Sequence, residues 1–366
     1  MTYFATCFLV GLIATLLLLR SPMRLGHLSA DHDLRGPQKF HARPVPRVGG
    51  MGVMAAVVAG VLIALVRESP DARYLWLLVA CSLPTFVAGI AEDLTKNVSP
   101  RRRLFATAIS AGLAIWLLGG VITRTDIPGV DQLIQWLPAA MFLTLFAVTG
   151  VANSVNIIDG FNGLASMCVL MMVLALGYVA FQVRDTFIFT ASLITAGAVL
   201  GFFVWNFPAG LIFLGDGGAY LLGFLLAELS VLLIARNPSV SPIFALLLCA
   251  YPIFETIFTI YRRKVVRGVA TAEPDGIHLH TLIHRRLIRW TLSENLAHRR
   301  LTRRNSMTSP YLWMLCLASV IPSLLWWNSS AVLSWFLLLF VVLYVWLYKR
   351  IVRFKTPKWL IFRRHR

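Results

Sequence analysis

The sequence predicts an all-α protein built as a polytopic bundle of membrane helices. Its 366 residues are 58% hydrophobic and only 14% charged, with a mean hydropathy of +0.74, whereas soluble globular proteins carry roughly 25% charged residues. Apolar stretches recur along the whole chain. We therefore expect one integral membrane domain over residues 1–366, rather than the two or three soluble domains that the length alone would suggest.

Eleven segments are long and apolar enough to cross a membrane, for which about 20 mostly apolar residues are needed. They lie at roughly 3–19, 50–66, 75–91, 104–122, 136–154, 163–182, 187–205, 218–235, 242–261, 310–327 and 332–348. The first resembles the core of a signal peptide, but it is followed by a basic exit and not by a small-residue cleavage site, at Ser21-Pro22-Met23-Arg24. We therefore expect an uncleaved helix there.

The basic residues divide unequally between the two sets of loops. One set carries 29 of the 34 Lys and Arg residues and comprises 20–49, 92–103, 155–162, 206–217, 262–309 and the tail 349–366. The other set holds Arg67, Arg73, Arg124, Arg184 and Arg236. The positive-inside rule then predicts an outside N-terminus and a cytoplasmic C-terminus. The formal charge of +18 is explained by topology, and no nucleic-acid partner is expected.

Four carboxylates are predicted where helices meet the cytoplasm, within segments rich in Gly or Asn: Glu92, Asp93, Asp159 and Asp216. A carboxylate at the membrane edge is costly unless it is paired, hydrated or bound to a cation. Hard cations such as Mg²⁺ take oxygen ligands, typically one or two from protein together with phosphates and water. The convergence on one face therefore indicates a cation and phosphate site.

The adjacent pair Glu92-Asp93 precedes the run Arg101-Arg102-Arg103. Neighbouring carboxylates on a helix point about 100° apart, so they are poor joint ligands for one ion. Their repulsion favours a role for one of them as a general base. The alternative is an interfacial pair that the arginines neutralise.

A polar stripe follows with a period of three residues: Asn153, Asn156, Asp159 and Asn162. This period places the amide and carboxylate groups on one helical face. Gly160 and Gly163 allow the backbone to approach a ligand closely. We interpret the stripe as functional rather than as helix capping.

A glycine-rich turn precedes a further helix at Gly215-Asp216-Gly217-Gly218. Such a turn suits phosphate held by backbone N–H groups, with a cation at the aspartate. Taken alone, it is equally a common tight turn.

The longest cytoplasmic loop gathers imidazole and guanidinium groups at His278, His280, His284, Arg285 and Arg286. Zinc is one interpretation, but no thiolate or HExxH pattern accompanies the histidines. Binding of a phosphate by imidazole and guanidinium fits better. A third interpretation is an amphipathic helix that touches anionic lipid.

Two glutamates, Glu228 and Glu255, fall inside predicted spans. Intramembrane acids are functional candidates by default. Glu255 either reaches the vestibule of the site or makes helix-to-helix hydrogen bonds.

Five motifs occur together and in a fixed order. They are Asp33 to His41 with Arg43-Pro44-Val45-Pro46-Arg47-Val48-Gly49-Gly50, then Glu92-Asp93 with Ser99-Pro100-Arg101-Arg102-Arg103-Leu104, the segment Asn153 to Gly163, Gly215-Asp216, and His278-Leu279-His280. In these motifs the chain resembles, over essentially its whole length, the polyprenyl-phosphate N-acetylhexosamine-1-phosphate transferase superfamily, glycosyltransferase family 4. The resemblance is to the bacterial branch that initiates O-antigen, common-antigen and teichoic-acid units.

The resemblance implies transfer of a HexNAc 1-phosphate, by default GlcNAc 1-phosphate, from a UDP-sugar to polyprenyl (undecaprenyl) phosphate with release of UMP. This reaction is the first membrane step of cell-envelope polysaccharide synthesis. The implied cofactor is Mg²⁺, with Mn²⁺ as a substitute. The implied location is the bacterial cytoplasmic membrane, with the active site facing the cytoplasm. The expected partners are the UDP-sugar, the lipid phosphate, the membrane and, as an option, a second copy in a homodimer.

The resemblance also implies a role for each motif residue. The metal ligands map to Asn156 and Asp216, and the catalytic residues to Asp93, Glu92 and Asp159. The substrate-binding residues map to Asn153, Asn162, Arg103, His278, His280, Arg285 and Arg286. Asp93 is then expected to take a proton from, or orient, the lipid phosphate, and a covalent aspartyl intermediate is the rival route.

A polytopic lipid or solute transporter is the alternative from a different functional class. Transporters place polar sites near the middle of the membrane, where both sides can reach them. Here the polar segments lie at one face, which favours an enzyme.

Overall fold

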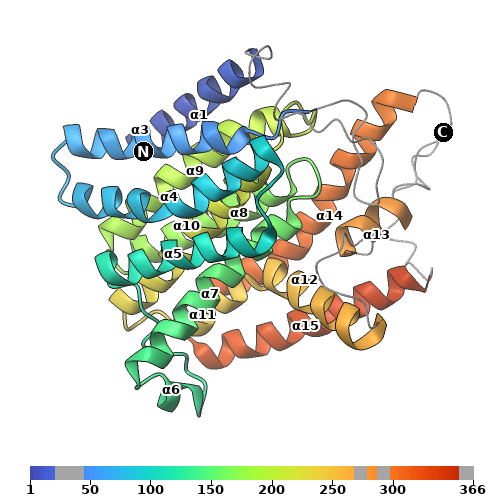
Figure 1. Cartoon of the computed structure of the whole chain (residues 1–366). Coiled ribbons are helices and arrows are strands. Elements are labelled where there is room, and N and C mark those ends of the chain that lie inside the picture. The colour runs from blue at the N-terminus through green and yellow to red at the C-terminus, as the bar shows by residue number, and fades with distance from the viewer. Residues whose placement is uncertain (21–44, 268–277, 287–296, 354–366) are drawn as a thin grey trace.

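A computed structural model of the chain describes residues 1–20, 45–267, 278–286 and 297–353. Helices build the described part and lie side by side in one bundle (Figure 1). The N-terminal half contains α1 (Thr2–Arg20), α3 (Gly49–Val66), α4 (Ala72–Thr95), α5 (Pro100–Leu118), α6 (Val130–Leu133), α7 (Leu137–Ile158) and α8 (Leu164–Gln182). The C-terminal half contains α9 (Thr186–Asn206), α10 (Gly215–Arg236), α11 (Pro242–Leu248), α12 (Ala250–Tyr261) with a π-helical turn at Arg262–Arg267, α13 (Leu279–Arg286), α14 (Ala297–Leu325) and α15 (Ser330–Val352).

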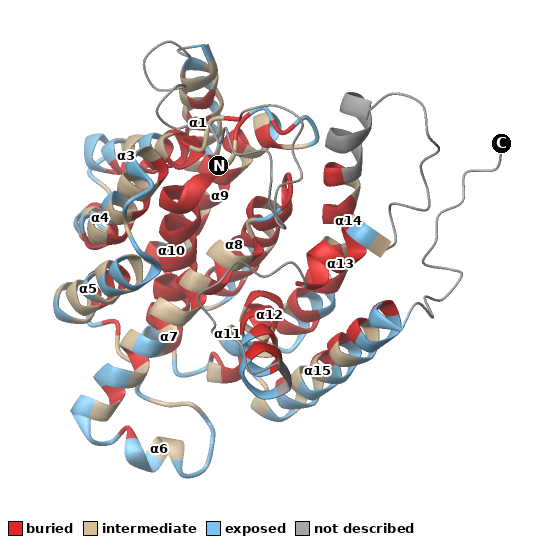
Figure 2. Ribbon diagram, turned by 45° about the vertical axis from the view of Figure 1, so that its right-hand side comes forward, coloured by how far each residue is buried: buried red, intermediate tan, exposed pale blue. Residues whose placement is uncertain are grey.

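Helix α10 forms the centre of the bundle. It packs against α3, α4, α7 and α8, and 94% of its most apolar stretch is buried inside the protein. Figure 2 shows α10 buried along its length, whereas α15 at the periphery is largely exposed. Because α10 is apolar on all sides, its N-terminal end is held by protein on every side and can place Asp216 with little freedom.

The predicted spans coincide with helices of the structure. By length and hydropathy, nine single helices of the described residues could cross a membrane, and a bent pair raises this number to ten. The prediction of eleven spans differs at α5, which begins with Pro100 and three arginines and is therefore less apolar. Since α5 nevertheless packs between α4 and α7, the chain is a multi-pass membrane protein, and the sidedness of its ends stays a prediction.

The predicted span 242–261 is not one straight helix. It consists of α11 and the α12 segment, which meet at a bend of 70° around Cys249. Pro252 has no N–H to donate to the carbonyl of Leu248, the residue at which α11 ends. Hydropathy does not register such a break, because both pieces are apolar.

Candidate active site

The centre of the site is Asp216 in the first turn of α10, with 8% of its surface exposed. Its Oδ1 accepts hydrogen bonds from Asn156 Nδ2 at 2.9 Å and from Arg47 Nη2 at 3.3 Å. Its Oδ2 pairs with the guanidinium group of Arg103. Four segments that are distant in sequence therefore meet at one carboxylate, and all contribute from the same end of the bundle.

Asp93 supports this centre from the last turns of α4 and is fully buried. Its two carboxylate oxygens accept the backbone N–H groups of Asp216 at 2.9 Å and Gly217 at 2.8 Å. Arg47 Nε lies 3.7 Å from the same carboxylate. The first N–H groups of a helix lack intrahelical partners, and a negative charge is favourable there. Asp93 thus caps α10 from a neighbouring helix and fixes the position of Asp216.

Glycines allow these segments to approach so closely. A Cβ on Gly50 would lie 2.3 Å from the backbone nitrogen of Gly218, and one on Gly89 would lie 2.5 Å from the Cα of Gly217. Gly215 has a φ of +76°, a conformation that L side chains rarely adopt. The glycines seen in the sequence therefore serve the packing of backbone against backbone beneath Asp216.

Tyr220, one turn after Asp216, joins the polar stripe of α7 to this centre. Its hydroxyl group donates to Asn153 Oδ1 at 3.0 Å, and the guanidinium carbon of Arg103 lies 5.7 Å from its ring centroid. Asn153 and Arg103 therefore share an aromatic platform that sequence analysis did not assign.

Asp159 caps the end of α7, and its backbone N–H donates to the carbonyl of Asn156 at 3.2 Å. Burial raises the pKa of the Asp159 carboxyl to about 7, with nearby Arg47 opposing the shift and the carboxylates of Asp216 and Asp93 adding to it. Near neutral pH this side chain exchanges a proton readily. Its position and its pKa together suit proton transfer.

The predicted histidine pair packs, through His280, against Gly160 and Phe161, the two residues that follow this aspartate. His280 in α13 is buried, and its Nε2 would lie 3.2 Å from a Cβ on Gly160. Its ring meets Phe161 edge to face at 5.5 Å and stacks on His278 at 5.0 Å. Burial, with a smaller contribution from His278, lowers the pKa of His280 to about 3. His280 is therefore a neutral imidazole at physiological pH.

Other predicted residues lie outside this hydrogen-bonded centre. Glu92 accepts the backbone N–H of Val98 at 2.7 Å. Asn162 hydrogen-bonds to Asn305 on α14, at 2.8 Å from its backbone N–H. Arg286 donates to backbone carbonyls at the end of α15, and Arg285 is exposed.

Sequence analysis assigned Arg47 no role in the site, and for Glu255 it left open a place near the site or a helix-to-helix hydrogen bond. Arg47 contacts both Asp93 and Asp216, and its place next to the Gly49-Gly50 pair was the available signal. Glu255 accepts the backbone N–H of Leu279 at 3.0 Å, beside the histidine pair. The segments Asp33–His41 and Arg43-Pro44 lie outside the described residues.

The residues around Asp216 fit a divalent cation that is held chiefly by its substrate. Within the ranges that the structure describes, no group of three or more His, Cys, Asp or Glu side chains could hold an ion. The remaining donor set is the Asp216 carboxylate and the Asn156 amide, whose oxygen and nitrogen exchange places by a simple flip. One carboxylate plus one amide is the sparse protein contribution that Mg²⁺ accepts when phosphates and water complete its shell.

Comparison with known proteins finds similar sequences of one kind. Residues 75–234 match the model of glycosyl transferase family 4, a range that contains the four predicted carboxylates. The chain is 27% identical to a probable undecaprenyl-phosphate N-acetylglucosaminyl 1-phosphate transferase of Bacillus subtilis, with 79% of this chain and 78% of the relative covered. It is 29% identical to the undecaprenyl-phosphate alpha-N-acetylglucosaminyl 1-phosphate transferase of Thermotoga maritima, covering 70% and 74%.

A third relative is the decaprenyl-phosphate N-acetylglucosaminephosphotransferase of Mycobacterium leprae, which is 28% identical with 78% of this chain and 76% of the relative covered. The alignments span most of both chains, and Asp93, Arg103 and Asn156 of the matched range contact Asp216. The matched range and these three relatives support the polyprenyl-phosphate N-acetylhexosamine-1-phosphate transferase superfamily as the family of this chain.

Proposed function

We propose that this membrane enzyme transfers GlcNAc 1-phosphate from UDP-GlcNAc to a polyprenyl phosphate, with release of UMP, at the cytoplasmic face of the bacterial inner membrane. The observation that carries the proposal is the meeting of Arg47, Arg103 and Asn156 on the Asp216 carboxylate. Guanidinium groups beside a cation-binding carboxylate are what a reaction between two anionic phosphates requires.

The two arginines screen the phosphates from each other. Both already lie against Asp216, and Arg103 is further held over the ring of Tyr220. Guanidinium groups bind phosphate oxygens in a planar, bidentate manner. Mg²⁺ bound at Asn156 and Asp216 would supply charge neutralisation and hold the diphosphate of the donor.

Asp159 is the better candidate for the proton-accepting residue. An oxygen of the lipid phosphate attacks the β-phosphorus of the UDP-sugar, the bond to the UMP oxygen breaks, and a proton on the lipid phosphate must leave. The pKa values of Asp159 and Asp93 are both raised to about 7, which matches this task at neutral pH, so hydrogen bonding decides between the two residues. The oxygens of Asp93 are both engaged with the N–H groups of α10, which supports a positioning role and disfavours a covalent intermediate on Asp93.

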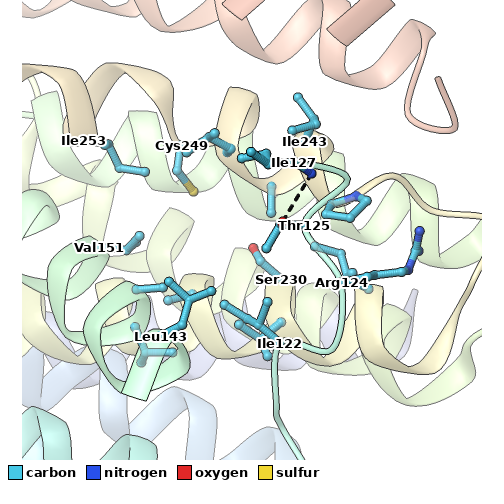
Figure 3. A pocket seen from close by; sticks show the side chains of 18 of the residues that line it. Ile122, Arg124, Thr125, Ile127, Leu143, Val151, Ser230, Ile243, Cys249 and Ile253 are labelled. Carbon is cyan, nitrogen blue, oxygen red and sulfur yellow. Dashed lines mark hydrogen bonds between the residues drawn. The ribbon is translucent and has the colours of Figure 1, made fainter. Parts of the chain in front are cut away.

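An apolar cavity of about 340 Å³ supports the lipid half of the reaction. It lies between α7, α10 and the bent α11–α12 pair, and Figure 3 shows Ile122, Leu143, Val151 and Ile253 around it. Val151 precedes Asn156 by five residues on α7, which is about 8 Å along a helix. A prenyl chain in the cavity would therefore reach toward the site.

Turnover by the purified protein tests the proposal. We expect lipid-linked sugar and UMP from polyprenyl phosphate, Mg²⁺ and labelled UDP-GlcNAc, within a panel that includes UDP-GalNAc and deoxy-HexNAc donors. Asp216→Asn should lower kcat by about 10²-fold or more, while Asp71→Asn, whose side chain makes no capping hydrogen bond in α4, should not.

The same assay distinguishes the proposed enzyme from a transporter. Absence of product with every donor, together with movement of lipid or solute across liposomes, would replace the enzyme by a transporter. Near-normal turnover of Asp216→Asn would remove this carboxylate from the chemistry.

A further inference from the structure

Glu255 is a buried acid that connects three helices of the bundle, with 1% of its surface exposed. It lies on α12, just beyond the 70° bend. Its Oε1 accepts the backbone N–H of Leu279 at 3.0 Å, at the beginning of α13. Its Oε2 accepts the hydroxyl proton of Tyr344 on α15 at 2.7 Å. The carboxylate thus fixes the start of α13 relative to two membrane helices.

The same oxygen also sets the ring of His278. His278 Nδ1 lies 3.2 Å from Glu255 Oε1 and 3.2 Å from the hydroxyl oxygen of Thr259, one turn further along α12. A carboxylate has no proton to donate, so the proton of this hydrogen bond belongs to Nδ1. The ring is therefore held with Nε2 on the side that faces away from Glu255. An acid behind an imidazole commonly fixes both its tautomer and its orientation.

Stacked imidazole rings connect Glu255 to the candidate active site. His278 stacks on His280 with an angle of 12° between the ring planes. His280 in turn lies over Gly160, the residue after Asp159. Displacing the His278 ring would therefore move the imidazole pair relative to the carboxylates.

We propose that Glu255 is a positioning residue for the donor: its carboxylate holds His278 so that Nε2 meets the diphosphate of the UDP-sugar. This inference rests on the proposed function, because it assigns the histidine pair to the donor. Glu255 itself touches neither substrate. Its contribution lies in donor binding and not in the acceptor or in the overall fold.

Glu255→Gln is the test because glutamine keeps the size of the side chain and removes its charge. We expect kcat/KM for UDP-GlcNAc to fall by about 10- to 100-fold, through a higher KM for the donor, with the KM for polyprenyl phosphate unchanged. Calorimetry with UDP alone should show weaker binding by a similar factor. Tyr344→Phe should act in the same direction with a smaller effect.

Glu228→Gln is the matched control. Glu228 is also a fully buried glutamate of the bundle, on α10, and neither of its oxygens has a hydrogen-bond partner among the described residues. Its substitution should leave UDP binding unchanged. Equal losses in Glu255→Gln and Glu228→Gln would overturn the proposal, because they would indicate a general effect on the bundle.

A double-mutant cycle on UDP binding separates positioning from structure. If Glu255 acts through His278, the double variant Glu255→Gln/His278→Ala should bind UDP no more weakly than His278→Ala alone. If the two substitutions weaken UDP binding by factors that multiply in the double variant, the inference is contradicted. If Glu255→Gln does not fold, Tyr344→Phe replaces it in the cycle with the same criteria.

The binding measurement also distinguishes this inference from the proposed function. Wild-type protein that binds UDP but makes no lipid-linked product disproves the reaction, while the cycle still decides the role of Glu255. Wild-type protein that does not bind UDP overturns both.

Discussion

At the scale of single residues, Asp93 shows how an acid in a catalytic motif can act through its neighbours. Both of its oxygens accept N–H groups of α10, and its side chain is fully buried. Asn at this position would offer one acceptor and would present its amide group to the other N–H. The free energy of a hydrogen bond to a charged group is about 1.5–3 kcal/mol, so the capping of α10 should weaken measurably.

We therefore predict that Asp93→Asn lowers the unfolding free energy by about 1–3 kcal/mol and raises the Mg²⁺ concentration needed for half-maximal activity, because Asp216 shifts. Denaturation in detergent and a Mg²⁺ titration measure the two effects. Glu92→Gln is the control, since the Glu92 carboxylate accepts the N–H of Val98 and does not cap α10. A lower kcat with unchanged stability and Mg²⁺ dependence would instead assign Asp93 to the proton transfer.

We predict that Asp159 determines the pH dependence of kcat/KM. Its pKa is raised to about 7, so the carboxyl is neutral below that pH and becomes an anion above it. If the anion accepts the proton, kcat/KM should rise as pH increases through about 7, because kcat/KM reports the free enzyme. A pH–rate profile from pH 5.5 to 8.5 checks this. The rise should disappear in Asp159→Asn, and a variant that keeps the same inflection would assign it to another group.

Sequence reasoning grouped residues that the structure places in contact where a motif and the membrane edge coincide. Asn156 and Asp216 were predicted together and meet at 2.9 Å. Arg286 was grouped with the histidines, yet it donates to the carbonyl of Ile351 at 2.8 Å. Such a partner, 65 residues away, is fixed by packing and leaves no periodic signal in the sequence.

At the scale of elements, the junction of α3 with α10 determines the geometry of the site. The N–H of Gly50 donates to the carbonyl of Leu214 at 2.9 Å, and the space beside Gly50 is filled by the backbone of Gly218. Backbone atoms cannot rotate out of the way as a flexible side chain can. An added methyl group must therefore push the two helices apart.

We predict that Gly50→Ala lowers the unfolding free energy by about 1–3 kcal/mol and reduces kcat, since Asp216 follows the displaced end of α10. Thermal unfolding and turnover in the same detergent measure both. Gly150→Ala on α7 is the matched control, because a Cβ there meets nothing within 4 Å. If both alanine variants behaved like wild type, the glycine contact would not control the site.

Helix α5 explains why a span can be missed by hydropathy and still belong to the bundle. Ser99 caps it by accepting the N–H of Arg102 at 3.4 Å, with Pro100 in the first turn. The basic run that reduces its apolarity is also what brings Arg103 to Asp216. The arginine that contacts Asp216 therefore belongs to a basic run that lowers the hydropathy of α5, although the helix is long enough to span.

At the scale of the whole molecule, topology is the property that most needs a direct measurement. The site residues gather at the ends of α4 and α7 and at the beginnings of α5 and α10, which places them on one side of the bundle. The alternation of basic residues predicted that side to be cytoplasmic. The bend at Cys249 was not predictable from hydropathy, whereas the segments themselves were.

We predict that a cysteine introduced at the exposed Asn97 reacts with a membrane-impermeant maleimide only after the cells are opened, and that one at the exposed Asp126 reacts in intact cells. The five native cysteines are buried and should contribute little background. Labelling in the reverse pattern would invert the topology and place the site outside.

The pairing around Asp216 also has a consequence for the empty enzyme. Arg47 and Arg103 carry two positive charges, and Asp93 and Asp216 carry two negative charges, within one set of contacts. Above the pKa of about 7 to which burial and the Asp216 charge raise Asp93, these four paired groups balance in charge. A donor diphosphate that arrives with a divalent cation also has a nearly balanced charge. Its phosphates can therefore pair with the arginines while its cation pairs with the carboxylates.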